Sequence, residues 1–276
     1  MKQGRKAMKK ILSLFVLATL ILLIANPGDC QESREIKKSF RLNSDGRVSI
    51  NTYKGSITIK TWDKSEVKVY VKIEADDWDK NSEKKVKSTE IDFDHSRRHL
   101  KIKTDYDKIN KQSSSLWGLF SKGTGSLPLV HYEIKMPRTA DLIIDDYKSD
   151  TEISNLGASI EFETYKGTVE IKELEGSIEL ETYKGEVEVD FKKMTGRNRF
   201  QTYKGSIEIS LAEDANFDLD LDIGRKGDLD SDFDIKTDRR GRKNREKYYR
   251  GSFNRGGTKL IIETEKGEIQ LKAKNP

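Results

Sequence analysis

Cysteine is almost absent from this sequence of 276 residues, because Cys30 is the only one. A single thiol excludes an intrachain disulfide, so the fold cannot depend on a disulfide framework. Export without disulfides is more typical of a bacterial envelope protein than of a small secreted eukaryotic domain.

Apolar residues are also scarce. They make up 34% of the chain and aromatic residues 8%, whereas charged residues make up 36%. A compact domain of this length normally carries a thicker apolar core. The composition therefore favours a thin, elongated fold that buries fewer side chains.

Signatures of catalysis are missing as well. The sequence has no Gly-x-Ser-x-Gly motif and three histidines, His95, His99 and His131. His95 and His99 lie four residues apart, but the alternating apolar residues nearby predict a strand, where that spacing forms no helical pair of metal ligands. We therefore expect no enzyme, no metal and no cofactor. The alternative is a carbohydrate-active enzyme of the β-helix type, although such enzymes usually build a cleft from longer coils.

The N-terminus has the pattern of a secretory signal peptide. Five basic residues precede an apolar run over residues 11–25, which Asn26, Pro27 and Gly28 interrupt. We assign residues 1–30 to this signal, with a mature start near Gln31. An uncleaved anchor and a lipidated Cys30 are the alternatives, and either would provide the membrane contact. The protein is then exported to the periplasm or surface of a bacterial cell.

The charge outside the signal segment is balanced. The whole chain has a formal net charge of +5, and residues 1–30 contribute +4 of it, which leaves +1 for residues 31–276. General attraction to nucleic acid is therefore not expected.

One tetrapeptide, Thr-Tyr-Lys-Gly, recurs four times, at 52–55, 164–167, 182–185 and 202–205. The related Asp-Tyr-Lys-Ser occupies 146–149, so the central tyrosines are 18, 18 and 20 residues apart. A fixed period of this length is typical of a β-solenoid, and glycines at half the period divide each coil into two short strands. We therefore predict an all-β, single-stranded β-solenoid (β-helix) with coils of about 18 residues and mostly parallel stacking.

The alternating pattern also predicts which side chains face inward. Ile160 and Phe162 match Ile178 and Leu180 one period later, so they are expected to stack inside the coils. The intervening glutamates, such as Glu163 and Glu181, are expected to form columns on the outside.

The repeats divide the chain into three parts after the signal segment. Residues 31–140 form an N-terminal strand region, 141–211 the central solenoid and 212–276 an Asp-rich and basic segment with closing strands. Within them, 76–87 is expected to be a charged loop. The 116–120 segment is expected to fold over an open end of the solenoid, with contact to a membrane or partner as the alternative. The strands around 260–262 and 269–271 are expected to close the solenoid.

The Tyr-Lys pairs are the leading candidate for a binding site. In register they would form a strip of aromatic rings beside ammonium groups, suited to sugar rings or an anionic polymer. The strip consists of Tyr165, Lys166, Tyr183, Lys184, Tyr203 and Lys204. The alternative is a structural role, in which the tyrosines stack on one another and the lysines neutralise the glutamate columns.

Two further polar segments are candidate ligand sites. The aspartates between 218 and 234 carry oxygen ligands for calcium, but their alternation is more typical of the solvent face of a strand. A basic loop could bind phosphate groups or could be a solvated surface loop. Its residues are Arg239, Arg240, Arg242, Lys243 and Arg245.

The segment from 127 to 142 resembles the strand that introduces the repeats in the bacterial putative-adhesin domain family, with Leu-Pro at 127–128 and Tyr-Glu-Ile-Lys-Met-Pro at 132–137. Segments 160–171 and 178–189 also resemble its repeat pattern, and the resemblance extends over 38–272. It implies a β-helix and no catalytic residue, since the family has no assigned activity. The Tyr-Lys pair departs from the small polar residues of relatives.

We therefore expect a non-catalytic, adhesin-like envelope protein that acts as a binding or scaffold surface. Its expected partner is an extended anionic glycan, such as cell-surface polysaccharide, or an envelope protein. The alternatives are the β-helix enzyme and an envelope regulatory or sensory domain.

Overall fold

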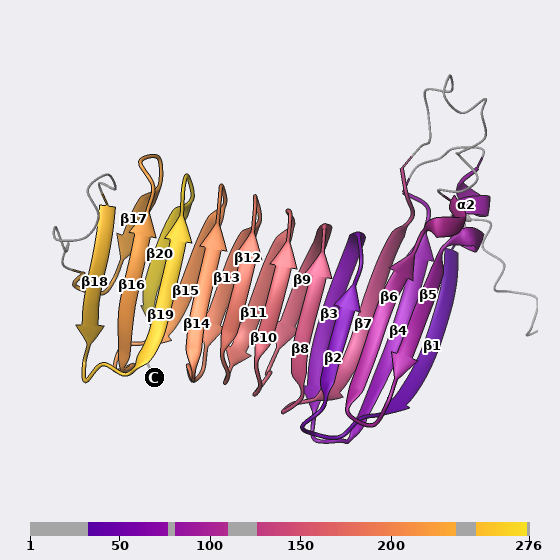
Figure 1. Cartoon of the computed structure of the whole chain (residues 1–276), viewed down its shortest axis with the longest axis horizontal. Helices are drawn as coiled ribbons and strands as arrows, with labels where there is room; N and C mark the ends of the chain where they lie inside the picture. Colours follow the sequence, from indigo (N-terminus) through magenta and orange to yellow (C-terminus); the bar gives the residue numbers. More distant parts are fainter. Residues whose placement is uncertain (1–32, 77–80, 110–125, 236–246, 275–276) are drawn as a thin grey trace, which may run out of the picture. The chain divides into compact units, whose positions relative to one another are not determined.

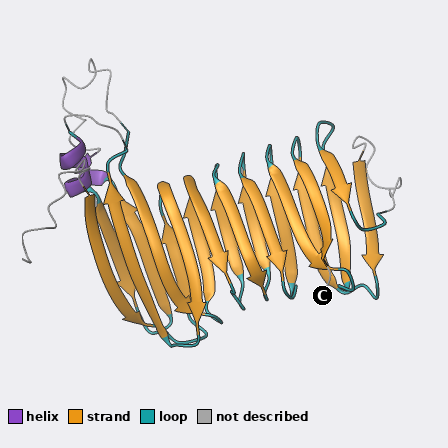
Figure 2. Ribbon diagram, turned by 180° about the vertical axis from the view of Figure 1, so that it is seen from behind, coloured by secondary structure: helices purple, strands orange, loops and turns teal. Residues whose placement is uncertain are grey.

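The computed structural model describes residues 33–76, 81–109, 126–235 and 247–274. The predicted signal segment, the basic loop and the 116–120 segment lie outside these residues. The described chain is mostly β, with a short helix, α2 (Ser82–Ser88), at its N-terminal end (Figures 1 and 2). None of the helices within these ranges has the length and apolar character needed to span a bilayer.

The strands form two sheets of ten strands each. Sheet A contains, in spatial order, β1 (Ser33–Arg41), β4 (Glu66–Glu74), β7 (Leu129–Pro137), β3 (Lys54–Trp62), β9 (Lys148–Ser154), β11 (Thr168–Leu174), β13 (Glu186–Phe191), β15 (Ser206–Ala212), β20 (Glu268–Lys274) and β17 (Asp228–Ser231). Sheet B contains β18 (Lys247–Phe253), β16 (Phe217–Ile223), β19 (Thr258–Thr264), β14 (Arg197–Thr202), β12 (Ile178–Thr182), β10 (Ile160–Thr164), β8 (Asp141–Asp146), β2 (Arg47–Asn51), β6 (His99–Asp105) and β5 (Glu90–His95).

Each central coil contributes one strand to each sheet. In sheet B, Ile160 pairs with Ile178 and Thr182 with Thr202 in parallel register. In sheet A, Val169 pairs with Val187, and β13 pairs with β15, also in parallel. The prediction of a mostly β fold with parallel stacking through the repeats is confirmed. The description as a single-stranded solenoid is wrong, because each central coil contains two strands, one in each of two separate sheets.

The core lies between the two sheets. The side chains of Ile160, Phe162, Ile178 and Leu180 are at most 2% exposed, as the alternation predicts. Phe200, on the next strand, is completely buried. Equivalent side chains therefore stack along the row of strands, and a thin core suffices for the length of chain.

The N-terminal region is more elaborate than the sequence indicates. Strand β2 pairs with β6 and β8, whereas β3 pairs with β7 and β9, so the 52–55 tetrapeptide crosses between sheets. The predicted loop at 76–87 is partly wrong, because 82–88 is helical. Val86 is 1% exposed and anchors this turn to the core, while Glu83 and Lys87 form an i,i+4 ion pair on its surface.

The C-terminal strands do not close the fold. Strand β19 lies between β14 and β16, and β20 lies between β15 and β17. The prediction of a closing pair is therefore wrong: the last coil continues the parallel stack. The final positions are taken by β17 in sheet A and by β18, which pairs antiparallel with β16, in sheet B.

Candidate ligand-binding surface

The repeated tetrapeptide forms the corner at which the chain leaves sheet B and enters sheet A. The threonine ends the sheet B strand with its side chain buried, and the Thr182 hydroxyl oxygen accepts a hydrogen bond of 2.8 Å from the Gly185 amide. Thr264 and Gly267 repeat this contact at 2.8 Å. The threonine therefore closes the turn that projects the next two side chains outward.

Successive corners are bonded directly to one another. The Lys166 amide donates to the Tyr147 carbonyl at 3.0 Å, and the Lys184 amide to the Tyr165 carbonyl at 3.0 Å. The glycine permits this approach, since a Cβ on Gly205 would lie 2.0 Å from a backbone oxygen of the preceding corner. These contacts hold all corner side chains in one register.

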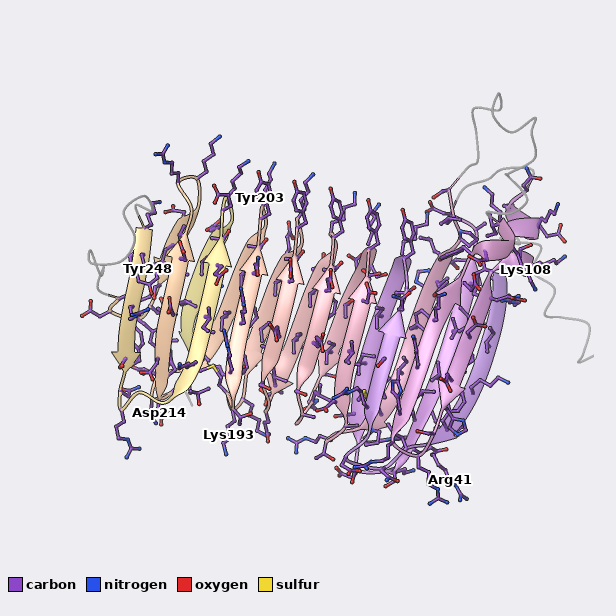
Figure 3. The ribbon with its side chains drawn as sticks, viewed as in Figure 1. Arg41, Lys108, Lys193, Tyr203, Asp214 and Tyr248 are labelled. Carbon is purple, nitrogen blue, oxygen red and sulfur yellow. The ribbon has the colours of Figure 1, made fainter. Side chains whose placement is uncertain are left out.

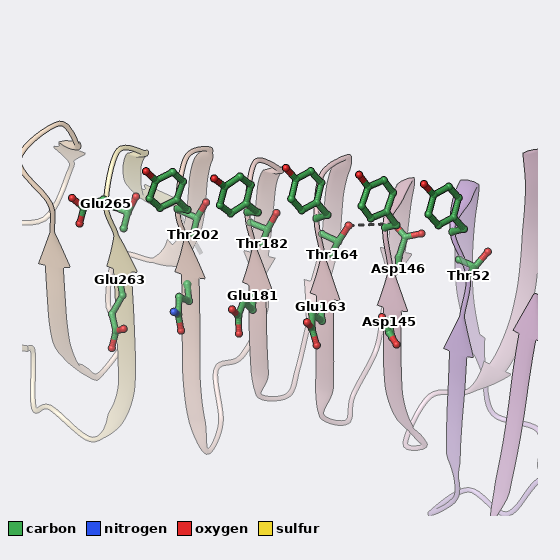
Figure 4. A pocket seen from close by; sticks show the side chains of 17 residues that line it. Thr52, Asp145, Asp146, Glu163, Thr164, Glu181, Thr182, Thr202, Glu263 and Glu265 are labelled. Atoms are coloured by element: carbon green, nitrogen blue, oxygen red, sulfur yellow. Dashed lines mark hydrogen bonds between the residues drawn. The ribbon is translucent and has the colours of Figure 1, made fainter. Parts of the chain in front are cut away.

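The tyrosines of five corners form a stacked ladder along the edge of the two sheets (Figure 4). Neighbouring ring centroids are 4.7–5.0 Å apart and the rings are tilted by 2–11°. Each side chain remains 36–39% exposed. We call this set the tyrosine ladder: Tyr53, Tyr147, Tyr165, Tyr183 and Tyr203.

Stacking changes what the tyrosines can offer to a ligand. The ring faces between neighbouring tyrosines are covered by one another, so they cannot stack on sugar rings, which was one of the two ligand types predicted for the strip. The ring edges and hydroxyl groups remain open to solvent. Tyr106 packs edge-on against Tyr53 with centroids 6.4 Å apart, and Lys266 lies 4.6 Å from the Tyr203 centroid, so both ends of the ladder are also covered.

Lys266 terminates the ladder at the corner where glutamate replaces tyrosine. Its ammonium donates a hydrogen bond of 2.7 Å to the Tyr203 hydroxyl, and this bond raises the pKa of Lys266. The sequence analysis did not assign a role to Lys266 or Tyr106. The Thr-Glu-Lys-Gly segment at 264–267 was the available signal for Lys266, whereas nothing in the local sequence marks Tyr106.

A groove of about 600 Å³ follows the ladder on the sheet B side (Figure 4). Buried threonines lie along its base, and Asp145, Glu163, Glu181 and Glu263 line it from the sheet. No lysine or arginine is among the described residues that line this groove. It is therefore an acidic surface.

A second groove, of about 530 Å³, lies on the sheet A side. Its described lining includes four lysines, Lys54, Lys148, Lys166 and Lys184, and three acidic residues, Asp76, Asp150 and Glu186. Lys54 is 8% exposed and forms a 2.7 Å ion pair with Asp76. The outer lysines differ, because none of them forms an ion pair with a described residue. They are Lys148, Lys166, Lys184 and Lys204.

The predicted strip residues are thus brought together, but in a different electrostatic setting from the one expected. The carboxylates of Glu163 and Glu181 face the groove on the sheet B side, and no ion pair joins them to the corner lysines within the described chain. Lys184 instead lies 5.5 Å from the Tyr183 centroid and 6.0 Å from that of Tyr165. The tyrosine ladder therefore separates the corner lysines on the sheet A side from the acidic groove on the sheet B side.

The aspartates of β16 are engaged by neighbouring strands. Asp218 accepts hydrogen bonds from the Ser252 hydroxyl at 2.6 Å and the Gly257 amide at 3.3 Å, and the Ser252 bond lowers its pKa. Asp220 accepts one from Arg250 at 3.1 Å. Across the described ranges, no three histidine, cysteine or acidic side chains are grouped as metal ligands.

The histidines lie on separate strands. His99 contacts the Ser49 hydroxyl at 3.1 Å, His131 contacts that of Ser56 at 2.8 Å, and His95 packs 5.1 Å from the Phe40 ring. These contacts do not bring two histidines together.

Comparison with known proteins places the chain in a family. The family model described as Toastrack DUF4097 matches residues 31–272. No curated protein matches the chain. A crystal structure of a putative cell adhesion protein from Clostridium sporogenes is similar, with 16% identity, a TM-score of 0.45, and coverage of 88% of this chain and 100% of that one.

Two other crystal structures are less similar. A putative adhesin from Bacteroides fragilis has 10% identity and a TM-score of 0.29, over 87% of this chain and 97% of that one. A putative lipid binding protein from Parabacteroides distasonis has 11% identity and a TM-score of 0.27, again over 87% and 97%. The family match covers most of the sequence and confirms the resemblance to the bacterial putative-adhesin domain family. The chain therefore belongs to the Toastrack DUF4097 family.

Proposed function

We propose that this protein is a non-catalytic binding or scaffold protein of the bacterial cell envelope, and that its corner strip contacts an extended anionic glycan. The corner strip is the tyrosine ladder together with Lys148, Lys166, Lys184 and Lys204. The observation that carries the proposal is the row of four corner lysines beside the tyrosine ladder, none of which forms an ion pair with a described residue. Unpaired ammonium groups at regular intervals attract a polymer whose negative charges also recur.

The strip suits a polymer better than a small molecule. Successive corners are separated by the strand spacing of about 4.8 Å, so each contact is repeated along the solenoid. Contacts that are individually weak then add along one chain, because each bound unit raises the effective concentration of the next. Tyrosine edges and hydroxyl groups would supply hydrogen bonds and apolar contact beside the charge.

The acidic groove limits where a polyanion can lie on the corner strip. Glu163 and Glu181 would repel a polyanion from the sheet B side of the tyrosine ladder. The ligand is therefore expected to follow the sheet A side, over Lys166 and Lys184.

Binding of polygalacturonate, a linear polyuronate, to the purified protein tests this proposal, with a neutral glucan for comparison. We expect the variant K148Q/K166Q/K184Q/K204Q to bind polygalacturonate at least about tenfold more weakly. The control K101Q/K103Q/K193Q/K259Q removes the same charge from exposed positions elsewhere, including Lys193 at the opposite end of the strands from Tyr203 (Figure 3). Equal weakening in both variants would contradict a specific strip.

A second measurement separates binding from catalysis. The same polymer is incubated with the protein, and new reducing ends or unsaturated products are measured. A non-catalytic protein leaves the polymer length unchanged. Shortening of the polymer that disappears in the strip variant would identify an enzyme and overturn the proposal.

A further inference from the structure

Three lysines lie side by side on the outer face of sheet A, away from the corner strip. Lys68 on β4 pairs directly with Lys135 on β7, and Lys135 pairs directly with Lys60 on β3 (strands in Figure 1). All three side chains are exposed. We call them the lysine row.

The lysine row is unfavourable in the protein alone. Like charges directly opposite on neighbouring strands, with Cβ atoms about 4.5–5.5 Å apart, destabilise a sheet. None of the three ammonium groups forms an ion pair with a described residue. Other lysines on this face do have acidic partners, since Lys172 pairs with Glu170 at 2.6 Å and Lys272 with Glu208 at 2.5 Å.

The surface over the lysine row is hollowed. A groove of about 1020 Å³ lies over β1, β4, β7, β3 and β9, and Lys37 and Lys38 also line it. Among the described lining residues, Glu133 and Glu152 are acidic and five are lysines, of which Lys37 pairs with Glu35 at 3.5 Å. The groove therefore has a net positive lining and room for a chain-shaped ligand.

The aromatic residues here are already engaged by the protein. The Trp62 indole donates to the Glu66 carbonyl at 2.8 Å, and Lys64 and Lys68 lie 5.1 and 5.5 Å from its ring. Lys37 lies 5.1 Å from the Tyr70 ring. These contacts engage the described aromatic side chains beside the lysine row, which leaves charge as the main recognition element.

We propose that the lysine row binds a linear phosphate-bearing polymer in this groove. Lysine binds phosphate groups as a compact point charge, and the described basic residues that line the groove are all lysines. The row runs across the strands at about 4.8 Å per step, so a polymer lying along it meets one ammonium group after another. This site is separate from the corner strip and does not depend on the function proposed above.

Linear inorganic polyphosphate is a suitable probe, and orthophosphate is the monomeric comparison. The measurement uses the K148Q/K166Q/K184Q/K204Q protein, so that the corner strip contributes nothing. In that background we expect K60Q/K68Q/K135Q to weaken polyphosphate binding about tenfold or more. The matched control K101Q/K103Q/K259Q removes three exposed lysines from the outer face of sheet B and should leave binding within about threefold.

Thermal unfolding at low salt gives an independent readout. Without polyphosphate, K60Q/K68Q/K135Q should unfold at a higher temperature than its parent, because the repulsion is removed. With polyphosphate, the parent should gain stability and the variant should not. Binding that survives the three substitutions would overturn the proposal. So would equal loss in the control, or binding to phosphatidylglycerol vesicles without binding to polyphosphate, which would indicate a membrane surface instead.

Discussion

Tyr53 and Tyr147 are 94 residues apart in sequence, yet their rings are parallel to within 2° with centroids 4.7 Å apart. The two corners meet because β3 pairs with β9 and β2 pairs with β8. The intervening strands add to the other edges of β3 and β2: β7 and β4 in sheet A, and β6 and β5 in sheet B. The Lys148 amide also donates to the Tyr53 carbonyl at 2.8 Å. The tyrosine ladder thus joins the N-terminal region to the central repeats.

The stacking should contribute measurably to stability. We expect Tyr183→Ser to lower the free energy of unfolding by about 1–3 kcal/mol, because two ring contacts are lost. Tyr183→Phe keeps both contacts and is the matched control. Urea denaturation of the two variants checks this, and equal stability would show that the rings are passive.

A triple tyrosine substitution tests whether the corner strip binds the glycan. Changing Tyr165, Tyr183 and Tyr203 together to Ser removes the ring edges but leaves every charge in place. Under the proposed function, polygalacturonate binding falls together with stability. Loss of stability with unchanged binding would show that these tyrosines serve only the fold.

The corner glycine should resist substitution for a steric reason. A Cβ on Gly205 would lie 2.0 Å from the Gly185 carbonyl oxygen, so Gly205→Ala should cost more than about 3 kcal/mol. Gly251→Ala is the control, since its Cβ would meet Phe253 at an ordinary 3.7 Å. Thermal unfolding of both proteins checks this difference, and similar stabilities would mean that the corners can separate without loss.

Asp146 should make stability depend on pH. Burial raises the pKa of this carboxyl, although the Ser149 hydroxyl donates to it at 2.7 Å. A raised pKa means that the folded protein holds the proton more tightly, so stability falls as pH rises from the ordinary value near 3.8 through the raised value. Asp146→Asn should therefore raise the unfolding temperature at pH 7 and have less effect at pH 4.

The exposed Glu161→Gln is the control for Asp146→Asn and should change little at either pH. A pH-independent effect of Asp146→Asn would contradict the assignment.

Asp76 should show the opposite pH dependence. Its hydrogen bond from Lys54 lowers its pKa, so the stabilisation is present above the ordinary value near 3.8 and is lost as pH falls through the lowered value. Asp76→Asn should cost about 1–3 kcal/mol at pH 7, because the buried Lys54 loses its counter-ion. Unfolding measured from pH 7 to pH 2 should show the two proteins converging. A constant difference across this range would contradict the ion pair as its source.

The sequence alone predicts the central repeats well. Tyrosines at intervals near one coil length must align if coils stack in parallel, and the alternation of Ile160 and Phe162 with glutamates separates inside from outside. The corner residues of the candidate strip follow from the same period. These features are local, because they depend on a nearly constant number of residues between successive corners and on a glycine where corners approach each other.

Other features depend on contacts between distant segments, and tertiary structure decides them. Lys60, Lys68 and Lys135 carry no common motif, and they become neighbours only because β7 lies between β3 and β4. The last strands enter the stack beside β14 and β15, because those edges still have unpaired backbone groups that a further parallel coil can satisfy. The sequence thus determines the period and the inward faces, whereas strand order determines which charges meet on the surface.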